Sequence, residues 1–163
     1  MKKTRSISTV AAAVMFFIAA ALFLPGCTPS DGGRLTLSDP ATGQVYASYP
    51  AQEGDEFSVE FIHSVNKSPV RDYYQCRADG IWNTRCVYYG FGAGVEEILL
   101  EGETLSYGAD GEMIVSNIDN RLDPMILVVG TISDHTFRMG EETVSLRDLC
   151  GRSSKVLFTY QPG

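Results

Sequence analysis

The stretch VRDYYQCRADGIWNTRCVYY, residues 70–89, contains the strongest hairpin signal in this chain. Two runs rich in β-branched and aromatic residues flank Asp79 and Gly80, a dipeptide typical of tight turns between antiparallel strands. A two-residue turn at this dipeptide would place Cys76 opposite Asn83. We therefore expect a β-hairpin whose register is set by the Asp-Gly turn.

Strand-like patterns continue on both sides of this hairpin. In residues 56–63, Phe57, Val59 and Phe61 alternate with polar residues, as in a half-buried strand. The sequence after the N-terminal region shows no convincing helical period. The expected strands are residues 34–38, 44–49, 56–63, 70–78, 81–89, 104–107, 112–117, 125–129, 135–139, 143–146 and 155–160. About ten short strands separated by turns predict an all-β fold, either a single-domain antiparallel β-sandwich or a partly open barrel.

The N-terminus resembles a bacterial lipoprotein leader. Three basic residues precede an uncharged apolar run of 15 residues, 10–24, which is shorter than the roughly 20 residues that a transmembrane helix needs. The sequence LPGC at residues 24–27 resembles the lipobox, in which the cysteine is diacylated and the leader is cut before it. The alternatives are an ordinary signal peptide with an incidental cysteine, and an uncut anchor helix.

These features predict three parts of the chain. Residues 1–26 form a lipoprotein signal peptide, residues 27–33 form a polar, lipidated tether, and residues 34–163 form one all-β domain. A lipid on Cys27 would anchor the domain to a membrane. The expected localisation is extracytoplasmic, in the periplasm or on the outer face of the cell membrane.

The composition is acidic. The chain of 163 residues has 13 Lys and Arg against 20 Asp and Glu, a formal net charge of −7. Loss of the leader would remove three basic residues and no acidic one, which leaves ten against 20 and a charge of −10. The chain therefore lacks the basic footprint of a nucleic-acid-binding protein. It also lacks a polybasic segment that could bind anionic lipid, so we expect membrane contact through the lipid on Cys27.

Three further cysteines, Cys76, Cys86 and Cys150, leave the disulfide pairing open. Outside the cytoplasm two of the three could pair, and at least one thiol would remain. A bridge between Cys76 and Cys86 would need a bulged hairpin or a longer turn, because the simple register places them apart and on opposite faces. The spacings match neither a zinc site nor a redox Cys-x-x-Cys motif, so we expect no metal and no cofactor.

Polar loops supply the candidate binding residues. His63, Ser64 and Lys67 follow the strand of residues 56–63, and loops on a rigid sheet often carry binding groups. A loop that hydrogen-bonds its own backbone would explain the same residues. Because neighbours in an extended chain point apart, His63 is not expected to activate Ser64 as a nucleophile.

Two other segments have alternative interpretations. Gly92 and Gly94 could form an anion-binding nest of amides or a tight bend. Arg121 lies in the polar connector expected at residues 117–124, where it could clamp a carboxylate or pair with a neighbouring Asp. The aromatic residues of the first hairpin favour cross-strand packing, with a contact surface as the alternative. They are Tyr73, Tyr74, Trp82, Tyr88 and Tyr89.

The order of several short motifs resembles one protein family, domain of unknown function 1850, over about residues 35–158. The matching pieces are His63-Ser64-Val65, Lys67, Pro69-Val70, Phe91-Gly92-Ala93-Gly94, Asn120-Arg121, Val129-Gly130 and Asp134-His135. Members are small secreted or membrane-anchored bacterial proteins, often encoded beside TRAP transporters of the TAXI type, which take up small organic acids. The family has no established activity, so the resemblance implies no catalytic residue.

We therefore expect a lipid-anchored extracytoplasmic accessory protein that is not an enzyme, with a TRAP transporter component as its partner. The alternative is a binding module for a small anionic ligand. Its site would bring together His63, Ser64, Lys67, Gly92, Gly94, Arg121 and His135. If these loops lay at opposite ends of the fold, a single site of this kind would be excluded. A hydrolase that uses His63 or His135 is the least favoured hypothesis.

Overall fold

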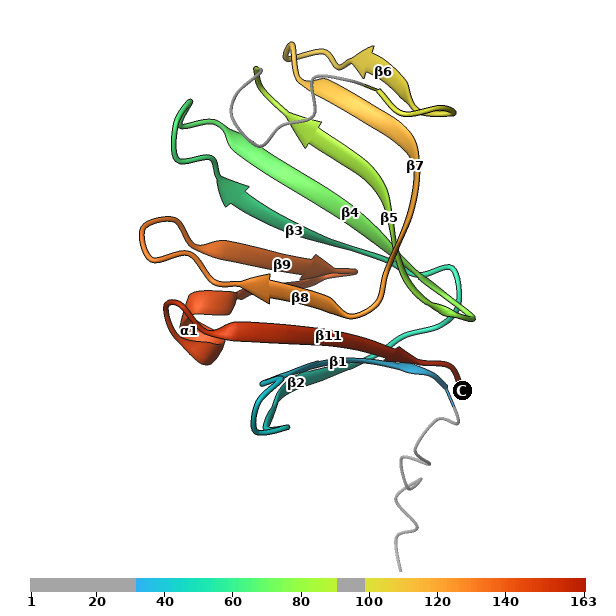
Figure 1. The fold of residues 1–163 in the computed structure, drawn as a ribbon, viewed down its shortest axis with the longest axis vertical. Helices are drawn as coiled ribbons and strands as arrows, with labels where there is room; N and C mark the ends of the chain where they lie inside the picture. Colours follow the sequence, from blue (N-terminus) through green and yellow to red (C-terminus); the bar gives the residue numbers. More distant parts are fainter. Residues whose placement is uncertain (1–31, 91–98) are drawn as a thin grey trace, which may run out of the picture. The chain divides into compact units, whose positions relative to one another are not determined.

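The computed structural model of this chain describes residues 32–90 and 99–163 (Figure 1). The expected signal peptide, most of the tether, and both Gly92 and Gly94 lie outside these residues. Residues Asp31–Gly163 form a unit of their own. Within the described residues, no helix is long and apolar enough to cross a membrane.

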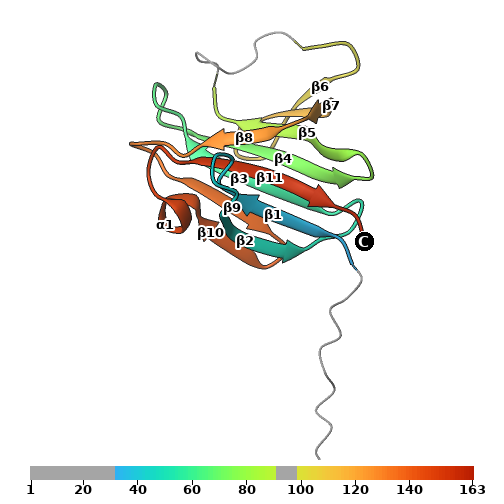
Figure 2. The same ribbon diagram turned by 60° about the horizontal axis from the view of Figure 1, so that its bottom comes forward.

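Eleven described strands form two sheets in which every paired neighbour is antiparallel (Figures 1 and 2). The small sheet has the order β2-β1-β11-β8. Its strands are β1 (Arg34–Ser38), β2 (Val45–Pro50), β8 (Met125–Val128) and β11 (Lys155–Gln161). The sheets do not close into a barrel, and the predicted all-β class is confirmed.

The large sheet has the order β10-β9-β3-β4-β5-β7-β6. Its strands are β3 (Glu56–Ile62), β4 (Pro69–Arg77), β5 (Gly80–Tyr88), β6 (Thr104–Tyr107), β7 (Met113–Leu122), β9 (His135–Met139) and β10 (Glu142–Ser145). Strands that follow one another in the chain are neighbours at β3, β4 and β5, as expected for hairpins. The predicted central hairpin is therefore confirmed as β4 and β5.

The register of that hairpin differs from the prediction. Cys76 lies opposite Ile81, and not opposite Asn83, because Arg77 already pairs with Gly80. Gly80 takes a φ of 133°, which is a glycine conformation, while it forms the first residue of β5. The turn therefore ends one residue earlier than a standard Asp-Gly turn would.

A bulge at Thr84 shifts the rest of the hairpin and places Asp72 opposite Cys86. Asp72, the residue opposite Cys86, lies four residues before Cys76 along β4, so the two cysteines are not paired across the hairpin. No disulfide joins Cys76, Cys86 and Cys150, the three described cysteines. The hairpin is bulged, but not in a way that brings the first two thiols together.

Strand β7 is longer than its sequence suggested. It continues through Leu122, whereas residues 117–124 were expected to be a polar connector. The strand has an irregularity opposite Thr84, where Asn117 takes a φ of 60°, and pairing resumes with Asn120 opposite Asn83. Pairing with the central strand β5 overrides the polar composition of this segment.

A short helix, α1 (Leu146–Cys150), replaces the end of the strand expected at residues 143–146. Ser145 caps the helix, since its hydroxyl accepts a hydrogen bond of 3.0 Å from the backbone N–H of Asp148. Ser-x-x-Asp is a helix-start pattern. The capping pattern coincides with the end of β10 at Ser145, whereas the expected strand continued to residue 146.

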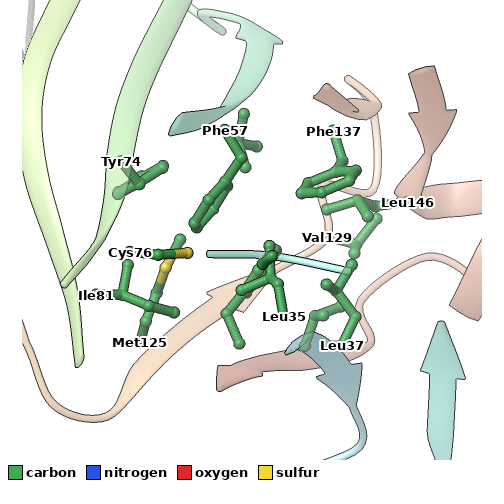
Figure 3. Packing of buried hydrophobic residues seen from close by; sticks show 14 residues of the cluster. Leu35, Leu37, Phe57, Tyr74, Cys76, Ile81, Met125, Val129, Phe137 and Leu146 are labelled. Atoms are coloured by element: carbon green, nitrogen blue, oxygen red, sulfur yellow. The ribbon is translucent and has the colours of Figure 1, made fainter. Parts of the chain in front are cut away.

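The main core lies between the two sheets (Figure 3). It contains Leu35, Leu37, Ala51, Phe57, Val59, Tyr74, Cys76, Ile81, Met125, Val129, Phe137, Leu146, Val156 and Phe158. The ring of Phe57 on the large sheet stacks on Phe158 of the small sheet, with centroids 5.7 Å apart. Burial of each such side chain stabilises the fold by roughly 1.5–3 kcal/mol.

A second cluster of buried residues belongs to the large sheet alone. Its members are Val70, Tyr88, Met113 and Val115, with Phe61, Cys86, Leu105 and Ile118 packed against them. None of these residues comes from the small sheet. The inner face of the large sheet, defined as the face that contributes to the main core, therefore has a covered part and a part that the small sheet does not cover.

Candidate functional site

The uncovered part of the inner face contains a cavity of about 550 Å³. Its apolar lining comes from Phe61, Val70, Tyr88, Leu100, Val115 and Ile118. Its polar lining comes from Asp72, Asn83, Cys86, Asn117 and Asn120, with Glu101, Glu103 and Asp119 completing the described wall. A cavity of this size, with apolar and polar side chains in its wall, is within the range of small-molecule sites.

The register of β4 places a carboxylate on this inner face. Alternate residues of a strand share one face, so Val70, Asp72, Tyr74 and Cys76 point the same way. Tyr74 and Cys76 lie in the main core, and Val70 lies in the second cluster. Asp72 therefore occupies the boundary between the two, directly beside the cavity.

Asp72 is held by neutral hydrogen-bonding groups. The side chains of Cys86, its cross-strand partner, and Tyr74 both donate to its carboxylate. Burial raises the pKa of Asp72 above its ordinary value of 3.8, and these two hydrogen bonds oppose that shift. Within the described residues, no Lys, Arg or His forms an ion pair with it. An uncompensated carboxylate in a cavity is a strong candidate for a functional group.

Tyr74 links the carboxylate to the main core. Its ring stacks on Phe57 at 5.1 Å, and its side chain also hydrogen-bonds Asn83, the residue opposite it on β5. Burial, and next the negative charge of Asp72, raise the pKa of Tyr74 above its ordinary value. Tyr74 therefore stays neutral and keeps its proton available for the carboxylate.

The electrostatic character of the cavity is acidic. Its described lining includes four carboxylates and no Lys, Arg or His. Besides Asp72, two of the four have partners: Glu103 accepts from the N–H of Leu100 at 2.8 Å, and Asp119 pairs with Arg77 at 2.7 Å. This wall repels an anion and attracts a cation.

The loop after β3 hydrogen-bonds itself, which is the second of the two interpretations that its sequence allowed. Val65 donates to the ring Nδ1 of His63 at 3.4 Å, and the N–H of Lys67 donates to the carbonyl of His63 at 3.1 Å. Asn66 donates to the carbonyl of Gly90, so this loop lies beside the end of β5. His63 is buried, whereas Ser64 and Lys67 are exposed, and Lys67 has a φ of 57°.

His135 lies at the same end of the sheet, opposite Phe61 of β3. Its ring packs on Phe61 at 5.1 Å, and its Nδ1 accepts from the N–H of Gly130 at 3.2 Å. A side chain at Gly130 would meet the carbonyl oxygen of Ser133 at 2.3 Å, so this close approach requires glycine. Burial lowers the pKa of His135, and its neutral ring therefore carries the proton on Nε2.

Arg121 lies at the other end of the large sheet. It pairs with Trp82 near the β4–β5 turn, whereas Tyr88 at the far end of β5 pairs with Met113. Its guanidinium donates to the carbonyl of Asp79 at 2.7 and 2.9 Å. Arg121 thus binds its neighbours, as its second interpretation predicted.

The predicted convergence of these residues on one anion site does not occur. His63, Lys67 and His135 share one end of the sheet, and Arg121 lies at the opposite end. The antiparallel register separates them by the length of β5, so no movement of a loop can join them. Gly92 and Gly94 lie outside the described residues.

The aromatic residues of the hairpin serve two faces. On the outer face, the guanidinium of Arg85 lies 3.8 Å from the ring centroid of Tyr73, and Arg77 lies 4.6 Å from Trp82. These are cross-strand cation–π contacts and not the purely aromatic packing expected. On the inner face, Tyr74 joins the main core and Tyr88 joins the second cluster.

The sequence contained a signal for Asp72 that motif analysis missed. In β4 the outward positions are Arg71, Tyr73, Gln75 and Arg77, all polar or amphipathic. The intervening positions must therefore face inward, and Asp72 is the charged residue among them. A carboxylate at an inward position of a central strand is unusual enough to indicate a site.

Fold and cavity together define a small all-β protein whose larger sheet carries an open cavity on its inner face. The family described as domain of unknown function (DUF1850) matches residues 57–146, more than half of the chain, and the chain belongs to this family. The match runs from the second residue of β3 through β10 and includes every described residue of the cavity wall. Neither the curated proteins nor the solved structures that were searched contain a match.

Proposed function

We propose that this protein is a lipid-anchored extracytoplasmic binding module that holds a small molecule in the inner-face cavity. The observation that carries the proposal is a cavity of about 550 Å³ beside the carboxylate of Asp72. A central strand that served only the core would have an apolar residue at this position. We favour binding over hydrolysis by His63 or His135, because the Nδ1 atom of each ring already accepts a backbone hydrogen bond.

A thermal-shift screen tests whether the cavity binds ligands. The panel contains amines, amino acids, carboxylates and divalent cations, each added to the wild-type protein and to Val115→Phe, which fills the cavity. A ligand at 100 times its dissociation constant stabilises the folded state by about 2.7 kcal/mol. We expect a hit on the wild type that Val115→Phe loses.

The matched control is Val128→Phe, the same substitution at a position on β8 that is 56% exposed and outside the cavity wall. It should keep the hit. Because an added ring can strain a core, the melting midpoint of Val115→Phe without ligand must first show that the variant folds. A hit that survives in a folded Val115→Phe protein would place the ligand elsewhere and contradict the proposal.

The proposed anchor rests on the leader pattern and Cys27. Labelling cells that produce the protein with radioactive palmitate tests it. The wild-type chain should incorporate the label, and Cys27→Ser should not. Equal labelling of both chains, or none of either, would contradict lipid attachment at this residue.

We further propose that the anchored module serves a TRAP transporter, in keeping with the resemblance of its motifs to proteins encoded beside such systems. The acidic wall of the cavity does not suit the organic acids that these transporters carry. The module would therefore contact or regulate the transport components and would not deliver their substrate. Crosslinking in native membranes, followed by mass spectrometry, should recover those components, and their repeated absence would contradict this role.

A further inference from the structure

We propose that the ligand of the inner-face cavity carries a protonated amine, and that the amine pairs with the carboxylate of Asp72. This inference rests on the proposed binding function and names the class of ligand. It replaces the anionic ligand of the alternative hypothesis from the sequence, whose supposed partner Arg121 is engaged at the other end of the sheet.

The first support is the position of Asp72 relative to positive charge. On the outer face of β4, the basic Arg71 pairs with Glu60, and Arg138 also reaches this glutamate. On the inner face, the described partners of Asp72 are the neutral side chains of Cys86 and Tyr74. The outer carboxylate therefore has two cationic partners, and the inner one has none among the described residues.

The second support is the cost of this arrangement in the empty protein. Asp72 is partly buried, and a carboxylate in such a position without a cation loses hydration that neutral hydrogen bonds restore only in part. The raised pKa of Asp72 reflects that loss. A bound ammonium would supply the missing charge beside a partly buried carboxylate, where water screens the pair less than it screens a pair on the surface.

The third support is the chemistry of the surrounding wall. Phe61 and Tyr88 contribute aromatic rings to the wall, and aromatic rings attract cations. The amide oxygens of Asn83 and Asn120 can accept the remaining ammonium hydrogens. Val115 and its apolar neighbours leave room for a hydrocarbon or aromatic body, so an aryl-alkyl amine matches both the size and the polarity of the cavity.

The test compares two probes that share one ring system and differ in charge, tryptamine and indole-3-acetate. The full chain is placed in lipid nanodiscs and treated at pH 7 with methyl methanethiosulfonate, a small uncharged thiol reagent. Peptide mapping by mass spectrometry then gives the modification rate of Cys86, which lines the cavity. Cys150, which does not line it, provides the internal control.

We expect tryptamine at ten times its dissociation constant to slow modification of Cys86 about tenfold, since the rate falls by a factor of 1 + [L]/Kd. Indole-3-acetate at the same concentration should leave the rate nearly unchanged. Asp72→Asn should abolish the protection by tryptamine. Asp110→Asn removes the same charge from the exposed turn before β7 and should keep the protection.

The outcomes separate this inference from the proposed function. Protection by indole-3-acetate that equals or exceeds that by tryptamine would overturn the amine class and leave the binding function standing. Protection by tryptamine that persists in a folded Asp72→Asn protein would exclude Asp72 as its partner. Failure of both probes to protect Cys86 would contradict the amine class and the binding function together.

Discussion

The two parts of the inner face of the large sheet come from the same strands and differ in what covers them. Where the small sheet covers this face, side chains of the large sheet pack against side chains of the small sheet. Phe57, for example, stacks on Phe158. Where the small sheet is absent, the second cluster, which includes the partly buried Cys86, lies beside a cavity that Asp72 also lines. The same alternation of residues therefore builds a core at one end and a site at the other.

This difference shows where the chain gives up stability for function. In the covered part every buried position of β3 and β4 is apolar or aromatic, apart from Ser58, which is 5% exposed. In the uncovered part a carboxylate sits among apolar side chains at a stability cost. Real proteins violate the pattern of inward apolar residues mainly at functional positions, and Asp72 fits that rule.

The largest effect should come from breaking the covered part. Phe57→Ala removes a ring that is 2% exposed and contacts both sheets. We expect it to lower the free energy of unfolding by about 3–5 kcal/mol, because truncation of a buried Phe also leaves a cavity. Urea denaturation followed by circular dichroism measures this change, and a loss below about 1 kcal/mol would contradict the position of the main core.

A matched pair of valines compares the two parts directly. Val59 in the main core and Val115 in the second cluster are 1% and 2% exposed. Val59→Ala should cost about 2.5 kcal/mol, the transfer of two methyl groups plus a new void. Val115→Ala should cost about 1.5 kcal/mol, because it enlarges a cavity that already exists. Equal losses in urea denaturation would indicate that the second cluster is packed as tightly as the main core.

Asp72→Asn should stabilise the protein without ligand at a pH above the folded-state pKa of Asp72, by less than Val59→Ala destabilises it. Because burial raises the pKa of Asp72 above 3.8, the folded state holds its proton more tightly than the unfolded chain does. Stability contributed by this group is thus present below pH 3.8 and is lost as the pH rises through the folded-state pKa.

The difference in unfolding free energy between wild type and Asp72→Asn, followed from pH 3 to pH 8, isolates this residue from the other carboxylates. The advantage of the variant should grow with pH and then level off. An advantage that shrinks as the pH rises would mean that the folded state favours the charged form of Asp72, and that a cationic partner is present in the protein itself.

The smallest effect is expected at the opposite end of the sheet. Arg121→Ala removes exposed pairs with Asp79 and Asp123 and should change stability by less than about 1 kcal/mol. It should not alter ligand binding in the thermal-shift screen. Loss of a hit in this variant would restore the anion site that the sequence suggested.

The sequence predicted strands better than it predicted their neighbours. Alternation and turn residues located β1, β6 and β9 to the residue. The bulge at Thr84 and the early turn at Gly80 depend on pairing between strands, and no local pattern encodes them. These two features place Asp72 opposite Cys86 and so create the polar part of the site.

The candidate site residues show the same limit of local sequence patterns. His63 and Arg121 were conspicuous in the expected polar loops, yet the fold gives both of them local hydrogen-bond partners. Asp72 belongs to no motif, and its importance depends on which face of β4 is left uncovered by the small sheet. That information requires the order of the strands, which short-range patterns do not contain.

The most direct test of the two-part inner face compares the thiols of Cys86 and Cys76 in the wild-type protein without ligand. Cys76 is fully buried in the main core, where burial raises its pKa to about 12, whereas Cys86 lines the cavity. Under native conditions a small neutral thiol reagent should modify Cys86 about 100-fold faster than Cys76, whose reaction requires local unfolding. In guanidinium the two rates should become equal. Equal slow rates under native conditions would show that both thiols lie in closed core, and would contradict the cavity.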